Sequence, residues 1–291
     1  MERTLISPLF LKRHRKAYYT LLILMIAVFA VVFVFPFYWM ITGAFKDPQE
    51  VIQPTPTIIP QTFHPETYVK AWNNLKIGRY FLNTAFYAFG AWFFQITIDV
   101  LAAYALSKLR PIFGGVILGA MLASLMLPMT ALLVPAYLTV SEVPIFGWNL
   151  INTPWALWLP GAANAINIYV LKRFFDQIPK DLLDAAAIDG AGKVRALWSV
   201  VLPLSRPVLA VTSIFAVIGA WKDFLWPLLV LQEPSVQNLS VALSRMGATS
   251  GVTPFTQLLA GMVFASVPMV VVFLVFQRHI LSGLAAGGMK G

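Results

Sequence analysis

The feature that most constrains this chain is a series of long apolar blocks, separated by short segments that hold nearly all of the charge. A helix needs about 20 apolar residues to cross the hydrocarbon core of a bilayer, and each block is long enough. The alternating segments of about ten residues that a membrane barrel would show are absent from the sequence. The blocks therefore predict an all-α, polytopic membrane protein. Its six spanning helices are expected at about 17–44, 80–107, 114–140, 151–173, 206–231 and 255–279.

The basic residues predict how these spans are oriented. With the N-terminus inside the cell, fifteen of the 21 Lys and Arg residues fall in cytoplasmic segments and five in outside loops, while Lys222 lies within a span. Cytoplasmic loops normally carry this excess of positive charge. The first apolar block is too long for a cleaved signal peptide. Residues 1–16 and 282–291 are thus expected to be cytoplasmic tails on either end of a membrane domain at 17–281.

Composition excludes several other classes of protein. The chain has no cysteine, so disulfides and thiolate chemistry are ruled out, and its three histidines lie in separate segments, with no carboxylate at ligand spacing from any of them. We therefore expect no metal site. The net charge of +9 is spread over helix flanks and reflects membrane orientation, whereas a nucleic-acid-binding protein would gather its charge on one folded basic face.

The longest internal segment able to fold in water on the cytoplasmic side is 177–203. Pro179 suits the first turn of a helix, because its missing N–H would be unpaired there in any case. Gly190 suits a tight turn at the end of that helix. Asp189 could cap a second helix over 193–202, which Pro203 would close. Small side chains along this segment would let it fit into a groove on another protein.

Two other interpretations of this segment are weaker. A DNA-binding helix–turn–helix has the same outline but would be held between two membrane spans. A phosphate-binding loop would need glycine at position 187 and Ser or Thr at 194, where the chain has Ala187 and Val194.

The same segment resembles the EAA loop of ABC importer permease subunits. The family pattern is Glu-Ala-Ala, two residues, Asp-Gly, nine residues, then an apolar residue, any residue and Leu-Pro. Asp184 stands where the family has Glu, which keeps the charge on a shorter side chain. The resemblance implies docking to an ATPase through Asp184, Ala185, Ala186, Asp189, Gly190, Ala191, Leu202 and Pro203.

Further segments are similar to the second, shorter permease subunit of the maltose-type carbohydrate importers. They include Pro36-Phe-Tyr-Trp39, Trp226-Pro227-Leu228 and the ending Gly287-Gly-Met-Lys-Gly291. The resemblance implies a type I importer permease fold in a bacterial inner membrane, and a carbohydrate cargo: an oligosaccharide, a polysaccharide fragment or a related polyol or uronate. It also implies a second permease subunit, two ATPase subunits that bind ATP and magnesium, and an extracytoplasmic solute-binding protein. This chain itself would carry no cofactor and no catalytic site. Its C-terminal tail could contact the ATPase through Gly287, Gly288 and Lys290.

Charged and polar residues inside the spans are candidates for contact with the solute. Such groups are costly in lipid and usually face protein or water. Aromatic faces beside polar groups suit sugar rings, so the candidate path comprises Trp221, Lys222, Asp223 and Asn164. Alternatively, the two charges pair with the partner permease, or the tryptophans form an interfacial belt. Asp99 is expected to serve helix packing.

Three alternative functions remain open from the sequence. An autonomous ion-coupled transporter would need a midplane ion site, for which the chain offers only scattered acids. A permease of the same ABC family could carry a non-sugar solute such as a glycerol phosphate. A membrane enzyme would need clustered catalytic polar residues, which the sequence does not show.

Overall fold

The computed structural model describes residues 15–55, 57–249 and 252–288, and the regular structure within these ranges is entirely helical. The chain forms two compact units. The first takes the described residues of Met1–Leu75 together with those of Thr249–Val263, and the second takes Lys76–Ala248 and Phe264–Gly291. The helix α16 (Phe255–Gly288) begins in the first unit and ends in the second.

The first unit holds the N-terminal apolar helix and the loop that follows it. Helix α2 (Arg15–Gly43) is apolar all round and buries only Gly43, as expected for a helix that meets lipid or another chain. It is followed by α3 (Pro48–Val51) and α4 (Glu66–Asn74). Helix α4 begins directly after Pro65.

Two buried charges order the segment between α2 and α4. Lys46 is only 2% exposed, donates from Nζ to the Thr57 carbonyl and lies 4.4 Å from the Trp39 ring centroid. Glu50 accepts hydrogen bonds from the Gln61 backbone and the Thr57 hydroxyl. Because buried charges are tolerated only when partnered, these contacts hold the loop in one arrangement.

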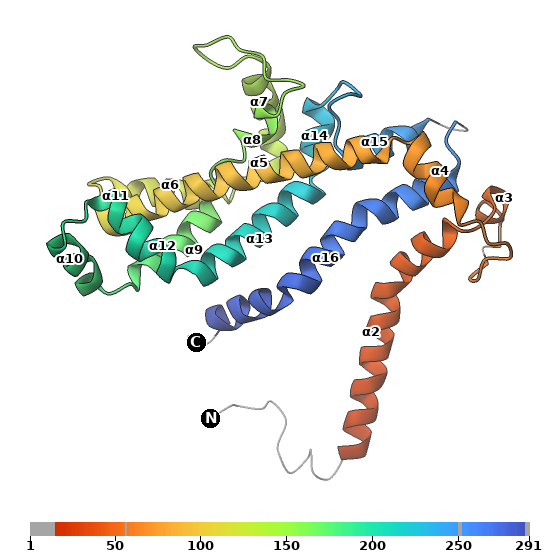
Figure 1. Cartoon of the computed structure of the whole chain (residues 1–291), viewed down its shortest axis with the longest axis horizontal. Helices are drawn as coiled ribbons and strands as arrows, with labels where there is room; N and C mark the ends of the chain where they lie inside the picture. Colours follow the sequence, from red (N-terminus) through yellow and green to blue (C-terminus); the bar gives the residue numbers. More distant parts are fainter. Residues whose placement is uncertain (1–14, 56, 250–251, 289–291) are drawn as a thin grey trace. The chain divides into compact units, whose positions relative to one another are not determined.

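The second unit is built around one long helix. Helix α5 (Ile77–Tyr104) continues into a π-helical turn, η1 (Ala105–Leu109), and packs chiefly against α9 (Ala165–Asp176) and α13 (Arg206–Lys222) (Figure 1). Their shared core includes Val100, Ala103, Tyr104, Ile168, Leu171 and Phe175.

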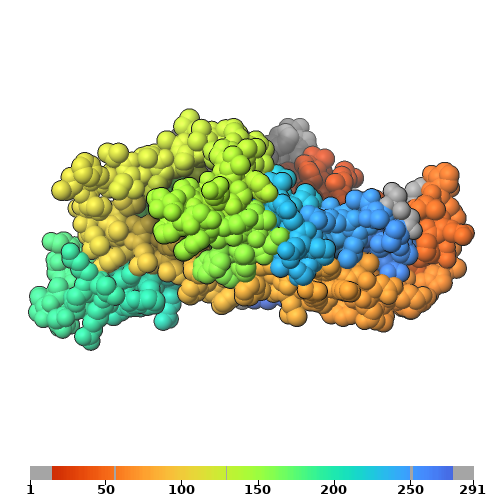
Figure 2. Space-filling view, turned by 90° about the horizontal axis from the view of Figure 1, so that it is seen from above, coloured from red at the N-terminus to blue at the C-terminus, as the bar shows by residue number. Residues whose placement is uncertain are grey.

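Shorter helices pack along the rest of the unit. Helix α6 (Gly114–Ser124) lies beside η1 and α9. Helices α8 (Trp155–Trp158) and α15 (Leu239–Ala248) pack against α5, and α7 (Met129–Ser141) and α14 (Leu225–Val230) lie next to each other. Helix α14 packs against α7 and α8, and these segments lie side by side in the space-filling view (Figure 2). A second apolar cluster joins them through Tyr87, Val140, Ala156, Trp226, Val230 and Leu231.

Three of the six predicted spans are continuous helices in the described residues. By length and composition, α2, α5 with η1, and the 255–277 part of α16 could cross a membrane. The other three predicted spans are interrupted: α6 and α7 are separated before Pro128, α8 and α9 around Pro160, and α13 and α14 at 223–224. Proline cannot donate a helical hydrogen bond, which accounts for the first two interruptions. Six spans therefore remain a prediction.

The 177–203 segment folds as the predicted helical hairpin, with two corrections. Helix α10 (Lys180–Ile188) begins after Pro179, and Gly190 makes the turn with a φ of +79°. Asp189 ends α10 and does not cap the next helix, because Gly192 occupies the N-cap of α11 (Lys193–Ala196). Pro203 does not close the second arm, which continues through π-helical η2 (Leu197–Val201) and α12 (Leu202–Leu204). The arm ends one residue after Pro203, at Leu204.

Candidate functional site

The 177–203 hairpin presents an exposed surface at one end of the second unit (Figure 1). Helix α10 buries none of its residues, although several are apolar. Ile188 is 87% exposed and Trp198, on the second arm, is 68% exposed. Apolar side chains gathered on a soluble segment usually mark a contact with another protein.

The residues that resemble the EAA loop lie on or near this surface. Asp184 is exposed and forms a 3.6 Å ion pair with Lys180 one turn earlier on α10. Exposed pairs of this kind contribute little stability, so Asp184 can exchange this partner for another. Of the remaining residues, Ala185, Asp189, Gly190 and Pro203 are exposed, and Ala186, Ala191 and Leu202 are half-buried.

The base of the hairpin is fixed to α5 and η1 by hydrogen bonds. The Tyr104 hydroxyl donates to the Lys193 carbonyl at 2.9 Å, and the Lys108 ammonium donates to the Ile178 carbonyl at 3.0 Å. Ile178 and Leu197 also enter the core shared by α5 and α9. An exposed tip on a packed base is suited to transmit a push from outside to the helices within.

Asp176, at the end of α9, adds a polar junction to this base. Its carboxylate accepts from the Ser107 hydroxyl at 2.7 Å and pairs with Lys172 at 2.8 Å. Burial raises the pKa of Asp176, but hydrogen bonds from Lys172 and Ser107 and the charges of nearby lysines outweigh it, so the pKa lies below its usual range. The carboxylate is therefore charged at neutral pH.

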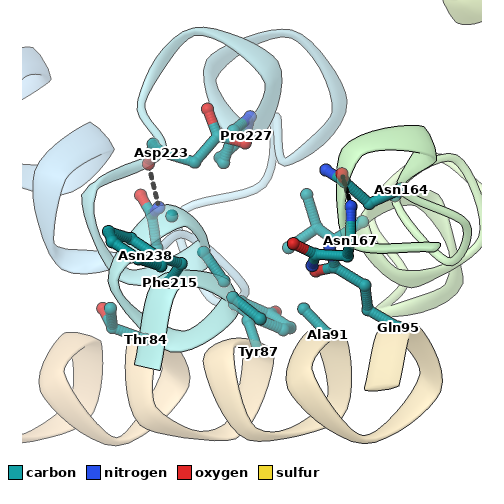
Figure 3. Close-up of a pocket in the computed structure, with 15 residues that line it drawn as sticks. Thr84, Tyr87, Ala91, Gln95, Asn164, Asn167, Phe215, Asp223, Pro227 and Asn238 are labelled. Carbon is teal, nitrogen blue, oxygen red and sulfur yellow. Dashed lines mark hydrogen bonds between the residues drawn. The ribbon is translucent and has the colours of Figure 1, made fainter. Parts of the chain in front are cut away.

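A cavity of about 330 Å³ lies between α5, α9, α13 and α14 (Figure 3). Asn164 and Asp223, both predicted for the solute path, line it. The other two predicted residues are described but do not line it. Trp221 is buried with its indole N–H donating to the Ala265 carbonyl, and Lys222 is exposed. Asp223 faces the cavity while Trp221 and Lys222 do not, because α13 ends at Lys222 and Asp223 takes an extended conformation before α14.

Asp99 serves the predicted packing role, and it does so at the wall of this cavity. The residue is 0% exposed, and its Oδ1 accepts from the Asn164 backbone N–H at 2.8 Å. The Asn164 side chain in turn caps α9 by accepting from the Asn167 N–H. Asp99 therefore joins α5 to the first residue of α9 and fixes the interruption between α8 and α9.

Several residues of both regions were not singled out from the sequence. At the hairpin base these are Tyr104, Ser107, Lys108 and Asp176, and in the cavity they are Gln95 and Asn238. For the cavity, the signal available in the sequence was the presence of polar residues inside apolar blocks. Three C-terminal residues were predicted to contact the ATPase. Gly287 and Gly288 fall in the last turn of α16, and Lys290 lies outside the described residues.

Comparison with known sequences decides the family. Residues 95–285 match the family described as binding-protein-dependent transport system inner membrane component. The chain belongs to this family. It is thus an inner-membrane permease of a binding-protein-dependent ABC importer, and the ion-coupled alternative is set aside.

Two relatives of this permease match it over nearly their whole lengths. The sn-glycerol-3-phosphate transport system permease protein UgpE of Yersinia pestis is 31% identical over 90% of this chain and 94% of its own. The trehalose/maltose transport system permease protein MalG of Thermococcus litoralis is 31% identical over 93% of this chain and 96% of its own.

A solved structure has the same fold. One chain of a bacterial ABC transporter that imports the acidic polysaccharide alginate aligns with a TM-score of 0.80. The sequence identity is 21%, and the alignment covers 91% of this permease and 97% of that chain. The expectation of an all-helical importer permease fold is therefore confirmed, apart from the number of spans.

Proposed function

We propose that this permease imports a carbohydrate as the second, shorter permease subunit of a complex. Its partners would be another permease subunit, two cytoplasmic ATPase subunits and an extracytoplasmic solute-binding protein. The chain carries out no covalent chemistry, since ATP and magnesium bind to the ATPase. The excess of Lys and Arg in the predicted cytoplasmic segments supports placing both termini in the cytoplasm.

The observation that carries the proposed coupling role is the exposed apolar surface of a hairpin whose base is packed. Helix α10 buries no residue, while Ile178 and Leu197 at its base lie in the core. A helix of this length would not keep its form in water without packing or a partner. We therefore assign the docking of the ATPase to the surface around Asp184, Ile188 and Gly190.

A carbohydrate cargo is supported by the relatives and by the cavity. Relatives are named for trehalose and maltose and, in Streptomyces coelicolor, for diacetylchitobiose. The cavity is lined by amide side chains, by Tyr87 and by one carboxylate, Asp223. Hydroxyl groups both donate and accept hydrogen bonds, so they can pair with amides and with a carboxylate.

A glycerol phosphate is the second candidate cargo, because the Yersinia relative is named for it at 31% identity. A phosphate dianion is normally bound by Arg, Lys or helix N-termini. The residues that line the cavity include no Arg, Lys or His and do include Asp223. That charge balance favours the carbohydrate.

The test of the docking surface is a single substitution, Ile188→Lys, in the reconstituted complex. Ile188 makes little contact within the chain, so the permease should fold normally. In the docked complex the substitution would replace one apolar side chain buried against the ATPase with an unpaired charge. ATPase binding should therefore weaken about tenfold or more. The measurement is the amount of ATPase that co-purifies with the permease, together with solute uptake into vesicles.

Ile59→Lys is the matched control, because Ile59 is also highly exposed but lies in the first unit. Unchanged ATPase recovery with Ile188→Lys would contradict the docking assignment. In the same vesicles, ATP hydrolysis stimulated by glycerol phosphate and not by neutral oligosaccharides would overturn the carbohydrate cargo.

A further inference from the structure

We infer that the cavity between α5, α9, α13 and α14 is a sugar-binding site carried by this subunit, suited to one uncharged pyranose ring. The inference rests on the proposed carbohydrate cargo and deepens it by naming the site and the charge class. Figure 3 shows Asp223 on one side of the cavity and Asn167 with Gln95 on the other.

Small residues on facing helices create the cavity. Ala91 lines it from α5, Gly161 from the segment before α9, and Ala216, Gly219 and Ala220 from α13. A Cβ added at Gly219 would meet no heavy atom within 4 Å. The volume of about 330 Å³ is at the lower end of the range of small-molecule sites, which suits one ring of a longer chain.

A rigid polar frame surrounds the space. The Asn238 side chain donates to the Asp223 carbonyl at 3.1 Å and accepts from the Val241 N–H. The Tyr87 hydroxyl donates to the Val236 carbonyl at 2.7 Å. Because these groups already have protein partners, they hold the walls in place without a ligand, which lowers the cost of binding.

Other polar groups of the lining are available to a ligand. Gln95 is half-buried, and its side-chain amide has no hydrogen-bond partner among the described residues. The Asp223 carboxylate lies near the backbone N–H groups of Phe224 and Trp226 and retains further acceptor sites. A sugar hydroxyl can donate to Asp223 and accept from Gln95, while the ring of Phe215, 49% exposed, offers an apolar face.

The charge of the lining selects against acidic sugars. Asp223 is its one carboxylate, and no described lining residue carries a positive charge. Like charges repel more strongly in a partly buried site than in water. An uncharged sugar avoids this repulsion, whereas a uronate or a sugar phosphate does not.

The first test fills the cavity from Gly219. Gly219→Leu places a side chain where the structure has open space, so complex assembly should be retained and uptake of a neutral oligosaccharide should fall about tenfold or more. Gly119→Leu is the matched control: Gly119 lies in the interior of α6, a Cβ there also meets nothing within 4 Å, and it lines no part of the cavity. Uptake by the control should match wild type.

The second test uses polar groups and does not depend on steric filling. Gln95→Leu removes the unpaired amide, and Asp223→Asn removes the charge but keeps an oxygen that can accept from backbone N–H groups. Each should raise the KM for the neutral oligosaccharide about tenfold. Asp223→Asn should in addition reduce discrimination against a uronate oligosaccharide of equal length.

The outcomes separate this inference from the proposed function. If wild type imports the sugar and Gly219→Leu, Gln95→Leu and Asp223→Asn keep its uptake rate and KM, the site is wrong and the importer assignment stands. If wild type itself neither imports sugars nor hydrolyses ATP in response to them, the proposed cargo fails.

Discussion

Gly90 provides a direct test of how α8 is held against α5. The Trp158 indole of α8 lies on the Cα of Gly90, and a Cβ added there would overlap the ring at Cε2, Cζ2 and Nε1. The indole N–H donates to the Tyr87 carbonyl at 3.1 Å in a buried setting. Gly90→Ala must therefore displace Trp158 and break this hydrogen bond.

The magnitude follows from three opposing effects. Replacing glycine by alanine inside a helix stabilises it by up to about 1 kcal/mol. Overpacking a buried contact costs about 1–3 kcal/mol, and an unpaired buried donor costs about 1–3 kcal/mol. The losses exceed the gain, so Gly90→Ala should destabilise the permease by about 1–5 kcal/mol.

The assay is thermal unfolding of the purified permease complex in detergent. Gly219→Ala is the matched control, because a Cβ at Gly219 meets no heavy atom within 4 Å and should leave stability unchanged or raise it slightly. We expect Gly90→Ala to melt clearly below wild type and Gly219→Ala to melt at or above it. If both variants melted at the wild-type temperature, the packing of Trp158 on α5 would be refuted.

Two further predictions concern the polar links of α5. Asp99→Ala leaves the half-buried Asn164 N–H unpaired and should lower the melting temperature, whereas Asp99→Asn keeps an acceptor and should restore most of it. Equal melting temperatures of the two variants would contradict this link. Tyr104→Phe removes the hydrogen bond to the Lys193 carbonyl and should reduce solute-stimulated ATP hydrolysis in vesicles. The ATPase should still co-purify, because the hairpin surface itself is intact. A hydrolysis rate equal to wild type would show that this bond does not contribute to coupling.

The sequence was sufficient for features that depend on local residues. Uncharged apolar blocks predicted the helices, and Pro179 with Gly190 predicted the hairpin, because proline and a positive-φ glycine impose their conformations locally. The family followed from the spacing between Asp184 and Pro203.

Features that depend on contacts between distant segments could not be predicted in this way. Asp223 was expected within a continuous helix, but the structure ends α13 before it, and Asn238, fifteen residues later, holds its carbonyl. Trp221 was expected on the solute path, but its indole N–H finds a partner on α16. Gln95 carries no sequence signal that separates it from a packing residue, because its role depends on the space left by small residues on α13.

The hydrogen bonds and connections between the helices indicate which walls of the cavity would move together. Helix α9 is joined at both of its ends to the C-terminal part of α5 and to η1, by Asp99 to the Asn164 N–H and by Ser107 to Asp176. This part of α5 and α9 should therefore move as one body. Helix α13 also packs along α5, but it meets the second arm of the hairpin through a bend of 84° next to Ser205. A push on the hairpin can therefore change that bend while α5 and α9 keep their mutual contacts. Because the cavity lies between this pair and α13, such a change would widen or narrow it, which connects the docking surface to the proposed sugar site.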